Sequence, residues 1–175
     1  SRQALKSNQS GGLRSPINQS RGMDMGMDVY GIAPTSEVGE YFRNNVWSWR
    51  PLWDFVGESC DLTLEMQRSG HFNDGLQIDE FTARRIAKTL FSLLHDGTVA
   101  NYQRKRDALL KALPDEECTH CNGTGVRDDE YVQGKCNGCN GTGKVRPFET
   151  HYPFSAENVA DFARFCYVSG GFEIC

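Results

Sequence analysis

Long hydrophobic runs are missing from this sequence of 175 residues. No stretch approaches the roughly 18 apolar residues that a membrane-spanning helix needs, and no apolar signal-peptide core is visible near the start. An excess of positive charge is missing too, because 23 acidic residues outnumber 19 basic residues and the formal net charge is −4. The chain as a whole therefore has no general attraction to nucleic acid or to anionic membranes.

The cysteines are not arranged as in a disulfide framework. Seven are present, four of them in two C-x-x-C pairs, which leaves an odd remainder of Cys60, Cys166 and Cys175. Paired spacing suits metal binding in a reducing compartment better than disulfide formation. We therefore expect the three remaining thiols to be reduced and the protein to be cytoplasmic.

The two pairs belong to an eight-residue unit, C-x-x-C-x-G-x-G, that occurs twice. Fourteen residues separate Cys121 of the first unit from Cys136 of the second. Two pairs at this spacing are typical of one tetrahedral zinc site, in which each thiolate lies about 2.3 Å from the metal. The glycines fit this interpretation, because the backbone after the second cysteine must turn tightly, often at positive φ. The sequence predicts one Zn²⁺ per chain, bound by Cys118, Cys121, Cys136 and Cys139.

Four thiolates fill the coordination shell of zinc, whereas a catalytic zinc keeps one position open for water. The predicted metal is therefore structural, and any enzyme activity would have to lie elsewhere. The alternative for the same residues is thiol chemistry, since C-x-x-C pairs can also cycle as disulfides. The glycine pattern favours zinc.

The repeated unit resembles the cysteine-rich zinc finger of DnaJ-type co-chaperones, over roughly residues 115–147. DnaJ carries four such units and two zinc ions, so two units here imply one ion. The sequence contains no His-Pro-Asp tripeptide, the J-domain motif that stimulates the partner heat-shock ATPase. The remainder of the chain resembles uncharacterised bacterial and bacteriophage proteins, which implies the bacterial cytosol, or the host cytosol if the protein is phage-encoded.

Composition and breaks in pattern divide the chain into four segments. Residues 1–22 are rich in Ser, Gln, Gly and Arg, and we interpret them as a flexible leader or a cloning remnant, with the native protein starting near Met23. We expect a helical core domain over 23–114 and an inserted zinc finger over 115–147. A C-terminal helix and strand over 148–175 are expected to complete the core.

The predicted fold class is α+β and mainly helical, with a small two-stranded sheet in which Phe172–Cys175 pairs with Met27–Gly31. Helices are expected to start at Ser36 and near Pro51, and to run over Asp79–Asp96, Thr98–Leu113 and from Ser155 onward. The short break at Gly97 predicts that the third and fourth of these form an antiparallel hairpin.

Apolar spacing gives the buried faces expected of these helices. In the third helix the stripe consists of Phe81, Ile86, Ala87, Leu90, Phe91 and Leu94. In the fourth helix the inward residues are Val99, Tyr102, Leu109, Leu110 and Leu113. Earlier in the chain, the core is expected to include Trp49, Trp53, Phe55 and Val56. The alternative for this aromatic-rich segment is a platform that stacks a base or grips a peptide, with Arg50 alongside.

Three functions follow from these features. The first is a non-enzymatic protein-interaction or chaperone-like adaptor that presents the finger to a protein partner. The second is nucleic-acid binding through a basic patch on the helical hairpin, made of Arg84, Arg85, Lys88, Arg104, Lys105 and Arg106. The third is an enzyme that uses His71, Asp74 or His151 in an aromatic-lined cleft. The finger itself argues against nucleic acid, because it has six acidic and four basic residues over 115–147.

Overall fold

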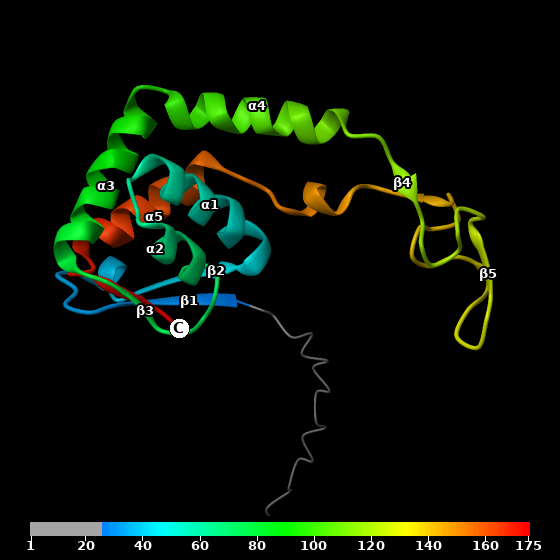
Figure 1. The fold of residues 1–175 in the computed structure, drawn as a ribbon, viewed down its shortest axis with the longest axis horizontal. Helices are drawn as coiled ribbons and strands as arrows, with labels where there is room; N and C mark the ends of the chain where they lie inside the picture. The colour runs from blue at the N-terminus through cyan, green and yellow to red at the C-terminus, as the bar shows by residue number, and fades with distance from the viewer. Residues whose placement is uncertain (1–25) are drawn as a thin grey trace, which may run out of the picture.

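The structure, a computed structural model, describes residues 26–175, so the predicted leader lies outside the described residues. Helices cover one face of a four-stranded antiparallel sheet, and a long arm carries a small module away from this core (Figure 1). The predicted α+β, mainly helical class is confirmed. The main sheet has four strands where two were expected, because two short segments with little sheet signal join it.

The sheet has the strand order β2-β1-β8-β3. These strands span Tyr41–Asn45, Gly26–Gly31, Phe172–Ile174 and Leu76–Ile78, respectively. Val29 of β1 is opposite Ile174 of β8, which confirms the predicted pairing. Alternate residues are buried under the helices, as the period of two in a strand requires.

The predicted helix at Ser36 is reduced to a 3₁₀ turn, η1 (Glu37–Gly39), and the chain enters β2 directly afterwards. The Ser36 side chain makes no capping hydrogen bond. Gly39 lies against the end of the last helix, where an added Cβ would be 2.4 Å from the Val168 carbonyl oxygen. This close backbone contact fixes the turn. The Tyr41–Asn45 segment, in which exposed and half-buried residues alternate, then pairs with β1.

Helix α1 (Val46–Ser59) begins at Asn45, whose side chain accepts a 2.8 Å hydrogen bond from the Ser48 N–H. Pro51 lies inside this single helix and does not start a new one, which corrects the prediction. The predicted core residues Trp49, Trp53, Phe55 and Val56 are all buried. The short helix α2 (Leu64–Ser69) packs beside α1, and backbone carbonyls at its C-terminal end accept the indole hydrogen bonds of both tryptophans.

Helix α3 (Glu80–His95) packs against α5 (Ala156–Val168). Its buried face contains Ala83, Ile86, Ala87 and Leu90. Phe81 was expected in this stripe, but its side chain is 79% exposed. At 100° per residue, Phe81 lies about 160° around the helix from Ala83, so it faces solvent.

Helix α4 (Thr98–Ala112) leaves α3 at a steep angle and extends away from the core (Figure 1). The predicted antiparallel hairpin is therefore wrong. Gly97 allows the sharp turn because its φ is +82°. Val99 is buried, but Leu109 is 71% exposed because this half of α4 lies beyond the core. The prediction that Leu109 faces inward is corrected accordingly.

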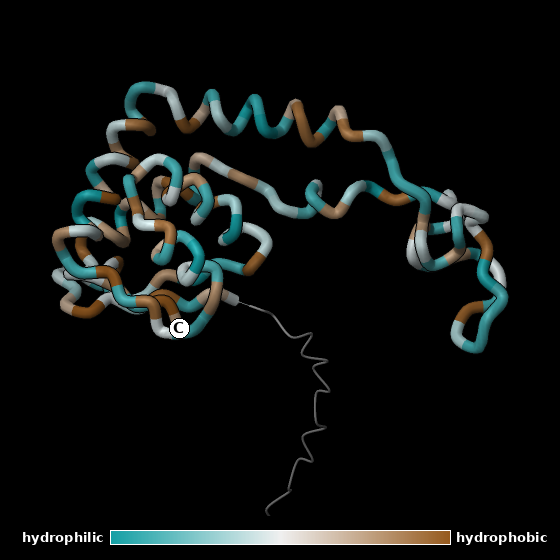
Figure 2. The backbone as a smooth tube through the Cα atoms, viewed as in Figure 1, coloured by the Kyte–Doolittle hydropathy of each residue, from teal (hydrophilic) through white to brown (hydrophobic). Residues whose placement is uncertain are grey.

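Beyond α4 the chain forms two small ribbons and then returns (Figures 1 and 2). Strand β4 (Glu116–Glu117) pairs with β7 (Lys144–Val145), and β5 (Val126–Asp128) pairs with β6 (Gln133–Lys135). The 3₁₀ turn η2 (Phe148–His151) then leads back to α5. No helix between residues 26 and 175 has the length and apolar character needed to cross a membrane.

Candidate metal centre

The four cysteines of the repeated unit lie in two equivalent turns. In the first turn the Gly123 N–H donates a 3.2 Å hydrogen bond to the Cys118 carbonyl. In the second turn the Gly141 N–H donates a 3.0 Å hydrogen bond to the Cys136 carbonyl. The same sequence unit therefore folds in the same way twice, and each turn directs two thiols to one point.

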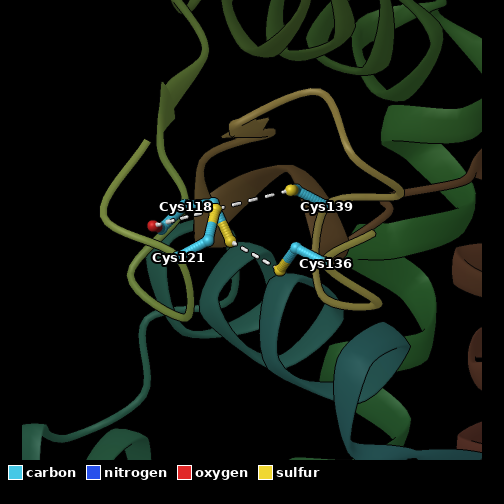
Figure 3. A group of neighbouring side chains, drawn as sticks. All are labelled: Cys118, Cys121, Cys136 and Cys139. Atoms are coloured by element: carbon cyan, nitrogen blue, oxygen red, sulfur yellow. Dashed lines mark hydrogen bonds between the residues drawn. The ribbon is translucent and has the colours of Figure 1, made fainter. Parts of the chain in front are cut away.

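The four sulfur atoms are turned toward one another and lie within 4.8 Å of each other (Figure 3). The Cys118 and Cys136 sulfurs are 3.9 Å apart, and those of Cys121 and Cys139 are 3.7 Å apart. A tetrahedral zinc with Zn–S bonds of about 2.3 Å places its sulfur ligands about 3.8 Å from each other. The cluster therefore has the dimensions of a four-thiolate site for one metal ion, as the sequence predicts.

Backbone N–H groups support the second cysteine of each turn. The Gly125 N–H donates a 3.2 Å hydrogen bond to Cys121 Sγ, and the Gly143 N–H donates a 3.3 Å bond to Cys139 Sγ. Such donors stabilise a thiolate, which is the form that binds metal. Burial alone would raise the pKa of Cys139, but the N–H donors and the neighbouring thiols lower this pKa to about 6. Burial raises the pKa of Cys118 to about 11.

Two glycines allow the turns to interlock. A Cβ on Gly125 would lie 2.5 Å from the Gly141 carbonyl oxygen, and a Cβ on Gly143 would lie 2.1 Å from that of Gly123. Both positions also have positive φ, at +76° and +74°. Here glycine is required twice over, for conformation and for space.

Two threonines contribute to the site that sequence reasoning did not assign. The hydroxyl of Thr124 donates a 2.7 Å hydrogen bond to the Cys121 carbonyl, and that of Thr142 donates a 2.7 Å bond to the Cys139 carbonyl. Each hydroxyl also accepts an N–H two residues later. These bonds tie the metal turn to the strand that follows it. The sequence did contain a signal for this role, because Thr occupies the same position in both copies of the repeated unit.

The three cysteines outside the cluster are free thiols. Cys60 and Cys166 are buried in the helical core, whereas Cys175 is exposed. Burial raises the pKa of Cys60 to about 12, so this thiol is protonated at neutral pH. The buried pair therefore has the character of core-packing residues, not of reactive nucleophiles.

The basic residues predicted to form one patch come from two helices that run in different directions (Figure 1). Arg84, Arg85 and Lys88 are on α3, whereas Arg104, Lys105 and Arg106 lie around the middle of α4, which points away from α3 (Figure 1). Several are also engaged within the chain. Arg84 pairs with Glu80 at 3.0 Å, and Arg106 donates to the Tyr152 carbonyl at 2.9 Å. Phosphate binding by these residues stays a prediction.

The two histidines proposed for an enzyme site line different hollows. His71 Nε2 lies 2.9 Å from Asp54 Oδ1, so its partner is a residue of α1 and not Asp74. His71 lines a hollow with Arg50 and Arg68, whereas His151 lines another with Trp47 and Phe148. Among residues 26–175, the hollow that contains His71 is therefore distinct from the one that contains His151, and an enzyme site at either histidine stays a prediction.

Comparison with protein-family models, curated proteins and solved structures gives no match to this chain. The resemblance to the DnaJ finger therefore rests on the repeated C-x-x-C-x-G-x-G unit, to which the geometry adds the four-sulfur cluster.

Proposed function

We propose that this protein is a non-enzymatic interaction protein, in which one structural zinc ion holds a DnaJ-like finger for contact with a protein partner. The observation that carries this proposal is the position of the four-cysteine cluster. It lies at the far end of an arm, away from the helical core (Figure 1). A module at this distance is accessible to another molecule on nearly all sides.

Zinc is the metal expected at such a site, because four buried thiolates at tetrahedral spacing are its usual structural ligands. The cysteines are the only buried cluster of the finger within the described residues, and Val145 is the one apolar residue packed against them. A segment this poor in apolar side chains depends on metal binding for its folding free energy. The ion thus makes the finger a rigid surface.

The tip of the finger, residues 126–132, offers a contact surface. Tyr131 is 83% exposed and Val126 is 58% exposed. Asp129 holds the tip in shape, because it accepts the N–H groups of Tyr131 and Val132 at 2.9 Å and pairs with Arg127. A large aromatic side chain held on a rigid turn is a typical anchor of protein interfaces. The exposed Asp128 and Glu130 nearby favour a partner with cationic groups around an apolar pocket.

The experiment compares the proteins that co-purify with the wild type and with two variants. Tyr131→Ser removes the tip anchor, whereas Phe81→Ser removes an aromatic side chain of similar exposure on α3. We expect a specific partner to be recovered with the wild type and with Phe81→Ser, and to be lost with Tyr131→Ser. Metal content and thermal melts of all three proteins check that the finger is intact.

A partner retained by Tyr131→Ser and by a variant with all four ligands changed to Ser would contradict the proposal. Recovery of DNA or RNA in a salt-dependent manner would instead support the alternative in which the basic residues of α3 and α4 bind phosphates.

A further inference from the structure

A hollow of about 770 Å³ lies between α4 and the segment that returns from the finger. Its lining is mainly apolar and includes Leu109, Leu110, Leu113, Pro114 and Pro147. Lys105 and Arg106 lie at one end, and Glu116 and Glu149 also border it. This arm hollow is separate from the metal cluster and from the finger tip.

Arginine side chains brace the arm on both sides of the hollow. Arg106 Nη2 donates a 2.9 Å hydrogen bond to the Tyr152 carbonyl. Arg146 donates 2.8 Å bonds to the carbonyls of Leu110 and Leu113. The two sides of the arm are therefore held at a fixed separation, and the hollow is a preformed feature of the arm.

The apolar lining is open to water. Leu109 is 71% exposed and stands on the face of α4 that borders the hollow. Figure 2 shows hydrophobic positions on α4 continuing into the half that has left the core. Exposed leucine beside an apolar hollow is the kind of surface that a second molecule covers.

Charges around this surface are arranged so that it complements itself. A basic turn, Arg104–Arg106, precedes the leucines, and an acidic run, Asp115–Glu117, follows them. Lys105, Glu116 and Glu117 form no ion pair with any residue in the range 26–175. When two copies of α4 lie antiparallel about Leu109 and Leu110, the basic turn of each copy faces the acidic run of the other.

We propose that the occupant of the arm hollow is a second copy of this chain, packed through α4 about a two-fold axis. Each copy inserts Leu109 into the hollow of the other, and Lys105 of each copy approaches Glu116 of its partner. A two-fold interface must be self-complementary, and the basic turn and the acidic run of this surface meet that condition for charge. The opposite arrangement, with parallel helices, would place like charges together.

The first test is sedimentation equilibrium of the full chain over a range of concentrations, with zinc present. We expect a monomer–dimer equilibrium whose dissociation constant rises at least about tenfold for Leu109→Glu, because a charged side chain then replaces a buried leucine in each copy. Phe81→Glu is the matched control, because Phe81 is similarly exposed but lies on α3. Its dissociation constant should match that of the wild type.

The second test exchanges the charges. Lys105→Glu and Glu116→Lys should each weaken self-association, by roughly threefold to tenfold, because both copies then present like charges. A mixture of the two variants should dimerise as the wild type does, since the glutamate introduced in one copy then faces the lysine introduced in the other. A chain that carries both Lys105→Glu and Glu116→Lys should also recover self-association, because each introduced charge again faces an opposite charge.

A wild type that stays monomeric at the highest soluble concentration would overturn the proposal. So would a dimer that Leu109→Glu does not weaken, or two charge variants that fail to restore each other on mixing. Unchanged melting curves and metal content keep loss of folding apart from loss of the interface.

Discussion

The backbone N–H of Cys118 donates a 2.9 Å hydrogen bond to the carbonyl of Gly143. The first cysteine of the cluster is thus fixed by the last glycine of the other unit. The reciprocal bond joins Cys136 N–H to the Gly125 carbonyl, also at 2.9 Å. The two units therefore close on each other, and neither turn is complete alone.

We expect Gly143→Ala to weaken metal binding severely. Its Cβ would lie 2.1 Å from the Gly123 carbonyl oxygen, at a φ of +74°, so the two turns must separate. Gly134→Ala is the control, because Gly134 also has positive φ, at +109°, but has no atom within 4 Å of the added Cβ. Competition with a metallochromic chelator measures the affinity. Equal affinities of the two variants would contradict the interlocked geometry.

Metal removal should unfold the finger but leave the core folded. The cysteine cluster and the helical core are separate clusters of buried residues, and we expect a bound metal to supply the folding free energy of the finger. Elemental analysis should find one zinc per chain. After chelation, hydrogen exchange should accelerate over 115–147, while α3 and α5 stay protected. Simultaneous loss of protection in both regions would show that the two fold as one unit.

Substituting a buried tryptophan should lower the free energy of unfolding more than substituting the exposed Trp47. Trp49 is fully buried, and its indole N–H donates a 2.7 Å hydrogen bond to the Gly70 carbonyl. Trp49→Phe leaves this carbonyl unpaired and a void beside it, so it should lower the free energy of unfolding by about 2–4 kcal/mol. Trp47→Phe, at a position 38% exposed, should cost less than about 1 kcal/mol. Urea denaturation of both variants measures the difference.

Arg146 should stiffen the arm without binding the metal. Arg146→Ala removes two charge-assisted hydrogen bonds to the carbonyls of Leu110 and Leu113, together with the ion pair to Asp115. We expect faster hydrogen exchange in the last turn of α4 and unchanged zinc content. Arg164→Ala, an exposed arginine on α5, is the control. Loss of zinc from Arg146→Ala would contradict this separation of roles.

The N-terminal cap of α3 should give a defined pH dependence. The N–H and the hydroxyl of Thr82 both donate 2.9 Å hydrogen bonds to the Asp79 carboxylate and hold its pKa below the ordinary value. A lowered folded pKa means that this stabilisation is fully present above the unfolded pKa, about 4, and is lost as pH falls through the folded value.

Asp79→Ala should therefore cost about 1 kcal/mol near neutral pH, and its difference from the wild type should shrink below about pH 4. Urea titrations at several pH values measure this difference. A constant difference down to about pH 2 would show that the carboxylate charge is not involved.

The clustering of the four cysteines could be predicted from sequence because local spacing decides it. Two C-x-x-C turns and their glycines bring four sulfurs together with little help from the rest of the chain. The burial of the core tryptophans and the pairing of β8 with β1 were also predictable, since large apolar side chains and a short apolar strand are stable mainly when they are buried.

The arm was not predictable from the same patterns. Leu109 and Leu113 have the spacing of a buried helix face, but spacing cannot show whether a partner element lies opposite. The direction that α4 takes after Gly97 depends on which helix α3 packs against, and α5 is distant in sequence. Phe81 is a different case, because its angle around α3 already excludes it from the buried stripe and the sequence alone could have shown this.

The position of β8 has a consequence for the order in which the parts of the protein can fold during synthesis. This strand lies between β1 and β3, so β3 gains its place in the sheet only when residues 172–174 arrive. On the ribosome, the four cysteines emerge before those residues do. The finger is therefore able to take up an ion before the sheet is complete, because β8 joins β1 to β3 only after residues 172–174 have emerged.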